Sequence, residues 1–394
     1  MVLPAVADAV YHAEPACIVV ADDMTGACDA GIWFARNGLR TRVSLGKAHA
    51  HESDVIVVST NSRRLTSPNA AGQVRIATEG LPLAHAGLVF KKIDSTFRGH
   101  IAAECDVLMK LAGAPFGVIV PAVPSQGRTM EGGILSVHDI AGSWRLDIKE
   151  ALEGHGVKTA TISPRGVTHA QEFASVMMRA SENSRFLLCD ATNEGDLAVT
   201  AGALKATGCR PLWIGAAGLA SHAASLLCAG GKTNNRTAAV GAGPVVLCVG
   251  SNHQVTLAQL ERVQQALGSN VLNADAASAG EISRAARGAT YLILILDTCS
   301  TDPVKLNEQL QEIRSCSPAA ILLTGGDTAA LVCQAAEVQE LVLEDEVVAG
   351  VPVGHIEGGL LDGIRVATKS GGFGGINCLA DCIHHLNNIT MGAR

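Results

Sequence analysis

The strongest constraint on the fold is a repeated alternation of short apolar runs with longer amphipathic stretches. The runs are rich in β-branched residues, and most end at a glycine or a polar turn. Such runs are typical of buried strands, and the stretches between them are typical of helices. The alternation therefore predicts βαβ units and a mainly parallel sheet. The runs cover residues 17–21, 54–59, 88–93, 116–121, 185–190 and 211–215, and then 244–250, 290–296, 319–326 and 351–356.

A break in this pattern divides the chain. Residues 228–243 read CAGGKTNNRTAAVGAG and have no hydrophobic period. The 394 residues also exceed what a single hydrophobic core usually holds. We therefore predict an α/β protein of two lobes, each a mainly parallel sheet flanked by helices, with the active site in the cleft between them. The predicted domains are residues 1–230 and 244–394, with a linker at 231–243.

Composition argues against several classes of function. The chain has 30 basic and 37 acidic residues, and its Lys and Arg do not gather with aromatic residues, so nucleic acid is not an expected partner. No apolar run has the length of a membrane span, and the first residues lack the basic start of a signal peptide, so we expect a cytoplasmic protein without a membrane partner. Because the 12 cysteines include no CxxC pair and the histidines no HExxH, we expect reduced, packed thiols and no structural metal.

Two carboxylates stand at the end of the first strand, in the segment IVVADDMTGACDAG. Ligands of open α/β sheets bind at the carboxyl ends of the strands, so Asp22 and Asp23 are candidate site residues. The helix that follows carries Asp29. The alternative is that one of the two acids only caps that helix. A cap does not need two acids, so a site is favoured.

The strand end at residues 89–104 gathers charged and hydroxyl side chains. They are Lys91, Lys92, Asp94, Ser95, Thr96 and Arg98. A small sugar acid has one carboxylate, which Arg or Lys binds well, and several hydroxyls, which need donors and acceptors such as Asp, Ser and Thr. The segment supplies both, and a salt-bridged strand end is the alternative.

The loop in residues 118–133 either brings Arg128 to an anion or is a rigid connection.

Two glycine loops in the second half are candidates for binding phosphate. The strand before Gly325 and Gly326 leads directly into a helix, and the bare amides of a helix N-terminus bind anions, although such a junction also occurs for packing alone. Residues 358–375 end in four glycines around Phe373, where backbone can approach a nucleotide closely.

Familiar nucleotide-binding signatures are absent. The segment at 231–233, Gly-Lys-Thr, has Leu226 where a Walker A loop needs its first glycine, and no GxGxxG follows a strand. Ser251, at another strand end, is either a hydroxyl near the phosphates or a helix cap.

The chain resembles the four-carbon acid sugar kinase family over nearly its whole length. The motifs that carry the resemblance, in the family's order, are ADDMTGACDAG, TNSR at 60–63, KKIDSTFRGHIAAE, PAVPSQGRT, GAAGLA at 215–220, TGGDTAAL and KSGGFG. The resemblance implies a sugar-acid-binding N-terminal domain and a nucleotide-binding C-terminal domain. It also implies transfer of phosphate from ATP to the 4-hydroxyl of D-threonate, D-erythronate or a 3-oxo-tetronate.

Roles follow for individual residues. The predicted substrate residues are Asp22, Arg63, Lys92, Asp94, Ser95, Thr96 and Arg98. The predicted ATP residues are Ser251, Gly325, Gly326, Asp327, Thr328, Gly371, Gly372 and Gly374. As a mechanistic hypothesis, Arg63, Lys92 or Arg98 holds the substrate carboxylate, and Asp23 or Asp94 accepts the proton of the attacking hydroxyl. Mg²⁺ on the ATP phosphates is implied as a second cofactor.

The motifs favour one substrate but leave other acids of the family open. KKIDSTFRG most resembles threonate kinases, which makes D-threonate the first choice. Residues 136–156 depart from the family pattern, so D-erythronate and 3-oxo-tetronate stay as alternatives. A dehydrogenase or aldolase of the same acids, and a sensor that kept only the acid-binding lobe, are alternatives of other classes. The expected partners are the acid and ATP, with a homodimer left open.

Overall fold

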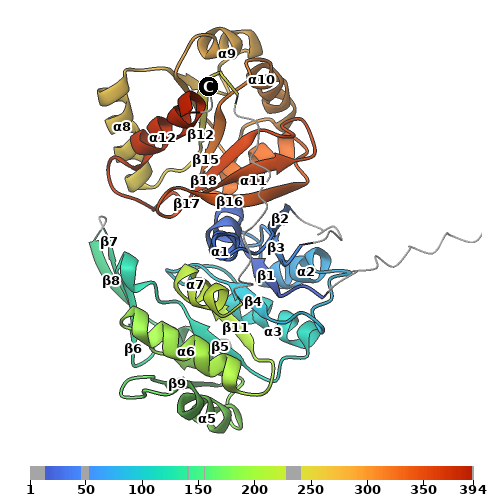
Figure 1. Cartoon of the computed structure of the whole chain (residues 1–394), viewed down its shortest axis with the longest axis vertical. Coiled ribbons are helices and arrows are strands. Elements are labelled where there is room, and N and C mark those ends of the chain that lie inside the picture. The colour runs from blue at the N-terminus through green and yellow to red at the C-terminus, as the bar shows by residue number, and fades with distance from the viewer. Residues whose placement is uncertain (1–13, 46–52, 140–141, 155, 228–240, 393–394) are drawn as a thin grey trace, which may run out of the picture.

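The computed structural model describes residues 14–45, 53–139, 142–154, 156–227 and 241–392, which form two α/β lobes stacked along the long axis (Figure 1). The predicted fold class is confirmed: each lobe is built on a mainly parallel sheet flanked by helices. The described residues include no helix that is both long and apolar enough to cross a membrane. Of the predicted linker, residues 231–240 lie outside the described part of the chain. The predicted domain limits stay predictions.

The N-terminal lobe has eight parallel strands in the order β2-β3-β1-β4-β11-β5-β10-β9. Residues of β1 and β3 are buried along their whole length, which is why these runs are apolar without alternation. The strands are β1 (Cys17–Ala21), β2 (Thr41–Leu45), β3 (Val55–Ser59), β4 (Val89–Lys92), β5 (Gly117–Val120), β9 (Thr159–Ile162), β10 (Phe186–Cys189) and β11 (Leu212–Gly215).

Helices cover both faces of this sheet. Parallel crossovers are right-handed, so connections that move in opposite directions along the sheet place their helices on opposite faces. Accordingly α1, α7, α6 and α5 pack in a row, and α2 packs on α3. The helices are α1 (Met24–Arg36), α2 (Ser67–Ala77), α3 (Ile101–Ala112), α4 (Ile148–Glu153), α5 (Ala170–Ser181), α6 (Glu194–Ala206) and α7 (Ala217–Leu226).

A small antiparallel sheet projects from this lobe and was not predicted. It follows β5 and the short 3₁₀ helix η1 (Pro124–Gln126), and consists of β6 (Arg128–Glu131), β7 (Ile134–Asp139) and β8 (Gly142–Asp147). Leu135 and Val137 bury its inner face, and Trp144, opposite Val137, continues that face to the cleft between the lobes.

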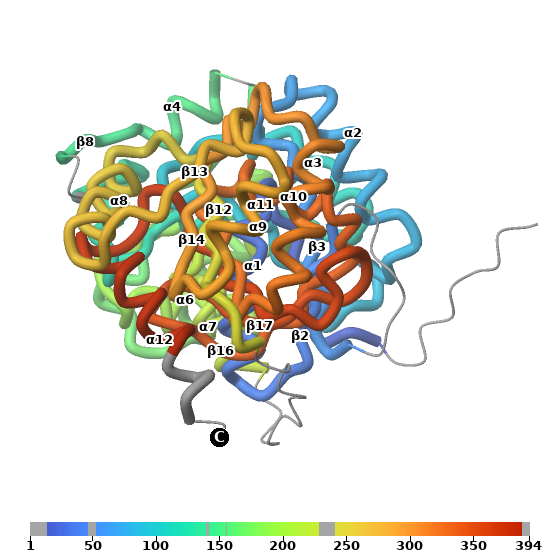
Figure 2. The backbone as a smooth tube through the Cα atoms, turned by 90° about the horizontal axis from the view of Figure 1, so that it is seen from above, coloured from blue at the N-terminus to red at the C-terminus, as the bar shows by residue number. Residues whose placement is uncertain are grey.

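The C-terminal lobe has five parallel strands and one antiparallel hairpin. The parallel strands are β12 (Val245–Val249), β13 (Val271–Asn273), β14 (Tyr291–Ile295), β15 (Ala320–Thr324) and β18 (Arg365–Lys369), and the hairpin is β16 (Glu340–Val348) with β17 (Val351–Glu357). Figure 2 shows α8 (Gln254–Leu267) beside α12 (Cys378–Gly392), which pack together. The other helices, α9 (Ala279–Ala286), α10 (Pro303–Ser315) and α11 (Gly326–Ala335), form a second group.

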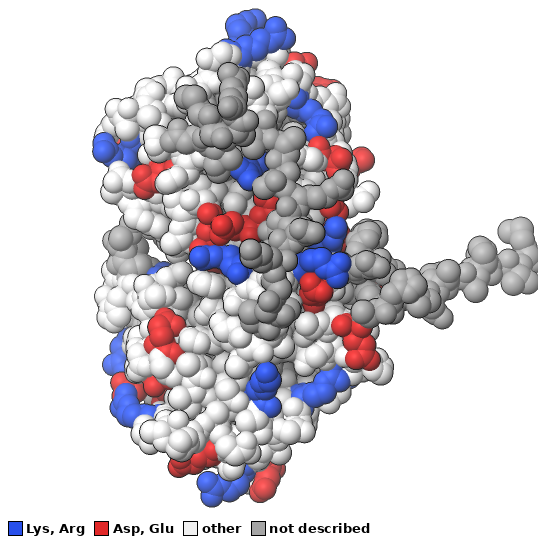
Figure 3. All heavy atoms as spheres, in the orientation of Figure 1, with Lys and Arg blue, Asp and Glu red and all other residues white. Residues whose placement is uncertain are grey.

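The two sheets are joined edge to edge, which the sequence did not predict. Strand β2 pairs antiparallel with β16, so that Arg42 lies opposite Val342, and one sheet of 15 strands runs through both lobes. The seam also carries ion pairs, because Arg42 bonds to Glu340 at 3.1 Å and to Glu357. On the face shown in Figure 3, acidic and basic side chains are interspersed, and both occur at the level where the lobes meet.

Candidate active site

A cavity of about 950 Å³ lies between the lobes, at the carboxyl ends of the parallel strands of both. In the N-terminal lobe, β1 and β4 are neighbours whose chains leave towards opposite faces of the sheet, and β12 and β15 are such neighbours in the C-terminal lobe. A crevice opens where the chain segments that follow two adjacent strands leave to opposite faces of the sheet, and ligands of α/β sheets bind in this crevice. The cavity is therefore in the place where the sequence predicted an active site.

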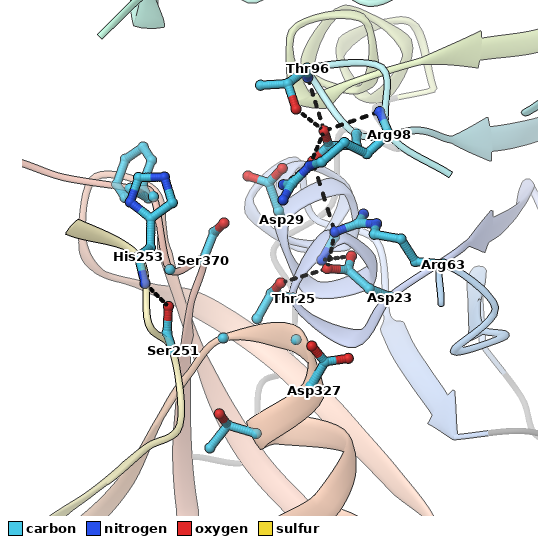
Figure 4. Close-up of a pocket in the computed structure, with 18 of the residues that line it drawn as sticks. Asp23, Thr25, Asp29, Arg63, Thr96, Arg98, Ser251, His253, Asp327 and Ser370 are labelled. Atoms are coloured by element: carbon cyan, nitrogen blue, oxygen red, sulfur yellow. Dashed lines mark hydrogen bonds and ion pairs between the residues drawn. The ribbon is translucent and has the colours of Figure 1, made fainter. Parts of the chain in front are cut away.

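Most of the predicted site residues line this one cavity. From the N-terminal lobe they are Asp23, Arg63, Lys92, Asp94, Ser95, Thr96 and Arg98, and from the C-terminal lobe Ser251, Gly325, Gly326, Asp327, Thr328, Gly371 and Gly372. Figure 4 shows the two groups facing each other. Asp22 and Gly374 do not line it. Thr25, Asp29, Arg64 and Trp144 do, and were not among the predicted site residues.

Arg63 is held by carboxylates of its own lobe. Its Nε and Nη2 each donate to Asp22 at 2.8 Å, and its Nη1 donates to Asp23 Oδ2 at 2.7 Å. Burial would raise the pKa of Asp22, but the charge and hydrogen bonds of Arg63, together with the charge of Lys91, outweigh burial and lower that pKa. Three donors of Arg63 are therefore bound to carboxylates of the protein. In this position Arg63 holds Asp23 in place and is less suited to binding a substrate carboxylate.

Asp23 both caps a helix and faces the cavity, so the two alternatives for the acid pair, a helix cap and a site residue, are both met by this side chain. Its Oδ1 accepts from the Gly26 amide at 2.8 Å as the N-cap of α1, and its Oδ2 accepts from Thr25 Oγ1 at 3.1 Å. The other lobe comes very close, because a Cβ added to Gly326 would lie 2.6 Å from Asp23 Oδ2. Asp23 therefore stands directly at the N-terminus of α11.

Asp94, the other predicted base, is fully engaged. Its two oxygens accept from Arg98 Nη2 at 2.8 Å and Nε at 2.9 Å, and Thr96 Oγ1 also donates to it. Although burial favours the neutral acid, the hydrogen bonds from Arg98 and the charge of Arg63 lower the pKa of Asp94. A carboxylate with a lowered pKa is a weak proton acceptor. Asp23 also accepts hydrogen bonds, from Arg63, Thr25 and the Gly26 amide, and what favours it as the base is its position at the N-terminus of α11.

The two neighbouring lysines point to opposite sides of the sheet, as successive strand residues must. Lys91 is buried against Glu104, and Lys92 lines the cavity with its Nζ 3.4 Å from Asp29 Oδ2. Burial raises the pKa of Asp29, and Lys92 reduces that effect. Asp29 could have been chosen from the sequence, because its spacing from Thr25 puts both residues on the same face of α1.

The C-terminal lobe offers backbone amides to the cavity. Helix α11 begins at Gly326 after Gly325, whose φ is 100°, and no side chain caps this end. Ser251 also lines the cavity, while His253 is the N-cap of α8, accepting from the Val255 amide at 3.2 Å. The N-terminus of α11 therefore leaves N–H groups for an anion, as the phosphates of a nucleotide require.

Side chains behind the second glycine loop turn its carbonyls away from the cavity. Thr256 Oγ1 donates to Gly371 O at 2.6 Å, and Gln259 Nε2 donates to the carbonyls of Phe373, Gly374 and Gly375. Lys369 Nζ donates to the carbonyls of Ser370 and Phe373 at 2.8 and 3.0 Å. Burial lowers the pKa of this lysine to about 8. Gly374 shapes the loop, since its own Cβ would meet Cys378 Sγ at 2.6 Å.

Gly371→Ala is expected to raise the KM for ATP about 10- to 100-fold and to leave the KM for the acid unchanged. The added methyl group would overlap Ser251 Oγ and displace the loop from the cavity wall, where the phosphates are predicted to bind. Steady-state kinetics with each substrate varied in turn measures this. Gly375→Ala is the matched control, because nothing lies within 4 Å of its added Cβ. Equal kinetics for the two variants would remove the loop from the site.

Two family models match this chain, one in each lobe. Residues 17–223 match a family described as a sugar-binding N-terminal domain, and residues 304–379 match one described as a nucleotide-binding C-terminal domain. Crystal structures of a Haemophilus influenzae and a Salmonella typhimurium protein share the fold, with TM-scores of 0.70 and 0.74 at 21% and 22% identity. Each alignment covers 94% of this chain, and 99% and 98% of the two proteins.

Several kinases match this chain over almost their whole length. D-threonate kinases of Bordetella bronchiseptica and Cupriavidus necator are each 31% identical to this chain, over 90% and 91% of it and 94% of each relative. Two lobes of this construction, with such relatives, define an enzyme that transfers phosphate to a small acid: a kinase. The chain belongs to the four-carbon acid sugar kinase family. The predicted class is thereby confirmed, and the sensor alternative is not supported.

Proposed function

We propose that this enzyme transfers the terminal phosphate of ATP to the 4-hydroxyl of D-threonate, giving 4-phospho-D-threonate. The observation that carries the reaction type is the position of Asp23, which faces the N-terminus of α11 across the cleft. The preference for D-threonate is supported by relatives of that activity at 31%, 31% and 28% identity. A D-erythronate kinase at 24% and a 3-oxo-tetronate kinase at 27% keep those acids as alternatives.

In this proposal the N-terminal lobe binds the acid and the C-terminal lobe the nucleotide. Lys92 and Arg98 line the cavity and are the cations that can receive the substrate carboxylate. Among the described residues, Lys92 has a single ion pair, at 3.4 Å with Asp29, and the Arg98 side chain, although paired with Asp94, is 61% exposed. Arg63 is the less accessible cation, since it is 20% exposed and bound to both Asp22 and Asp23. Asp23 accepts the proton of the attacking hydroxyl. The bare amides at α11 and the glycine loop bind the phosphates, which fits a reaction that depends mainly on positioning and charge neutralisation.

The residues present fit a magnesium ion held mostly by the nucleotide. Among the described residues, no group of three or more His, Cys, Asp or Glu side chains is arranged to bind a metal. Mg²⁺ in such enzymes is bound by one or two carboxylates together with substrate phosphates, and Asp327 lies at the helix end where the phosphates are proposed to bind. The ion would neutralise phosphate charge. A cytoplasmic location and a homodimer stay predictions.

The test is release of ADP by the purified protein with ATP and Mg²⁺. D-threonate, D-erythronate, L-threonate and 3-oxo-tetronates are supplied separately, and the phosphorylated carbon is located by ³¹P NMR. We expect the highest kcat/KM with D-threonate and a phosphate on C4. A higher value with another acid of the panel would replace the substrate. No acid-dependent turnover in a protein that still binds ATP would overturn the kinase assignment, and an acid-dependent absorbance change with NAD would favour a dehydrogenase.

A further inference from the structure

The charge of the cavity wall is divided unequally between the lobes. Among the described residues of the C-terminal lobe that line the cavity there are two carboxylates, Asp297 and Asp327, and neither Lys nor Arg. Lys369 is in this lobe but lies behind the glycine loop, bonded to its carbonyls. A nucleotide polyphosphate carries several negative charges, and kinases neutralise part of that charge with Arg or Lys. Such a cation has to come from the other lobe.

The N-terminal lobe contributes all the Lys and Arg side chains among the described residues that line the cavity. They are Arg63, Arg64, Lys92, Arg98 and Arg128. Arg63 and Arg98 are bound in two-point contacts to carboxylates of their own lobe, which orient them towards the acid site. Lys92 pairs with Asp29, also of this lobe.

Arg64 has a different partner. Its Nη2 lies 2.5 Å from Oδ2 of Asp327, so the pair crosses from one lobe to the N-terminus of α11. The pair is open to solvent, since the side chains are 64% and 41% exposed. An exposed ion pair contributes little to stability, so its arginine can change partner at little cost. Arg63 and Arg98 each make two hydrogen bonds to a carboxylate that is nearly buried, with Asp22 4% and Asp94 11% exposed, so losing either pair would cost more.

We infer that Arg64 is the cation that binds the terminal phosphate of the nucleotide, and that Asp327 holds it at the phosphate site until the nucleotide arrives. This inference rests on the proposed function and names one of its binding residues. It explains why a lobe that binds the acid extends an exposed arginine to the helix end of the other lobe. It also means that one side chain links the two lobes and neutralises the nucleotide.

The test compares nucleotides that differ in the terminal phosphate. Isothermal titration calorimetry measures the binding of ADP and of the non-hydrolysable analogue AMP-PNP, both with Mg²⁺, to wild type, Arg64→Ala and Arg64→Lys. We expect Arg64→Ala to bind AMP-PNP about 10- to 100-fold more weakly, as the loss of a charge-assisted contact predicts, and ADP less than about threefold more weakly. Arg64→Lys should keep part of the AMP-PNP affinity, because it keeps the charge but not the planar fork.

The control is Arg75→Ala, which removes the same charge from an exposed position on α2 of the same lobe, away from the cavity. If Arg64→Ala weakened the binding of ADP and AMP-PNP equally, the residue would only link the two lobes. If it weakened the binding of neither nucleotide, the residue would have no part in nucleotide binding. Either result would overturn the inference. Because the readout is binding, it is independent of turnover. Absence of acid-dependent turnover in the wild-type protein would instead count against the proposed function.

Discussion

Asp23→Asn is expected to lower kcat about 100-fold or more while leaving ATP binding intact. Asparagine caps helices as well as aspartate does, so the contact with the Gly26 amide can be kept and α1 should remain folded. The substitution removes the carboxylate that faces the N-terminus of α11, and with it the proposed proton acceptor. Steady-state kinetics gives kcat, and calorimetry with AMP-PNP gives the affinity for nucleotide.

The control for this variant is Asp302→Asn, the same change at the N-cap of α10, where Asp302 accepts from the Val304 amide at 3.0 Å outside the cavity. It should keep wild-type kcat.

Asp94→Asn separates the two predicted bases. It should mainly raise the KM for the acid, because Asp94 orients Arg98. A large loss of kcat in Asp94→Asn with little change in Asp23→Asn would exchange their roles. Near-native rates in both would end the mechanism.

Glu104→Ala is expected to destabilise the N-terminal lobe by about 3–5 kcal/mol. Glu104 Oε2 lies 2.7 Å from Lys91 Nζ, and the two side chains are 1% and 0% exposed. Removing the carboxylate leaves the Lys91 charge buried without that partner, which is far more costly than losing a surface ion pair. Glu104 Oε1 also accepts from Ser62 Oγ at 2.5 Å, next to Arg63, so activity should fall along with stability. Urea denaturation followed by circular dichroism measures the change.

Asp106→Ala is the matched control on the same helix. Asp106 pairs with Lys110 and with Arg185, both at 2.6 Å, but at the surface, so its loss should cost about 1 kcal/mol or less. If Glu104→Ala proved no more destabilising than Asp106→Ala, the buried pair would have no special part in stability. In a second test, replacing both partners by apolar residues, Lys91→Met with Glu104→Leu, should recover much of the stability, since neither charge is then left alone.

The sequence predicted the strand ends of the site because local rules suffice there. A strand buried on both faces needs a continuous apolar run, so β1 and β15 could be placed from composition alone, and the residues that follow them had to lie at the carboxyl edge of a sheet. The same rules could have found Asp29. They could not have found the sheet β6–β8, because only Met130 of β6 is buried and β8 is exposed along nearly its whole length, so the apolar pattern is weak.

What the sequence determined by itself was the order of strands and helices along the chain, and which of their ends carry chemistry. The tertiary structure alone decided the partners: that Arg63 binds Asp22 and Asp23, that Arg98 binds Asp94, and that Arg64 reaches Asp327. It also decided that β2 and β16 join the sheets. The reason is physical. Hydrophobic periodicity is a property of neighbours in the chain, whereas the strength of a charge pair depends on distance and burial, and these are set only when the two lobes have packed.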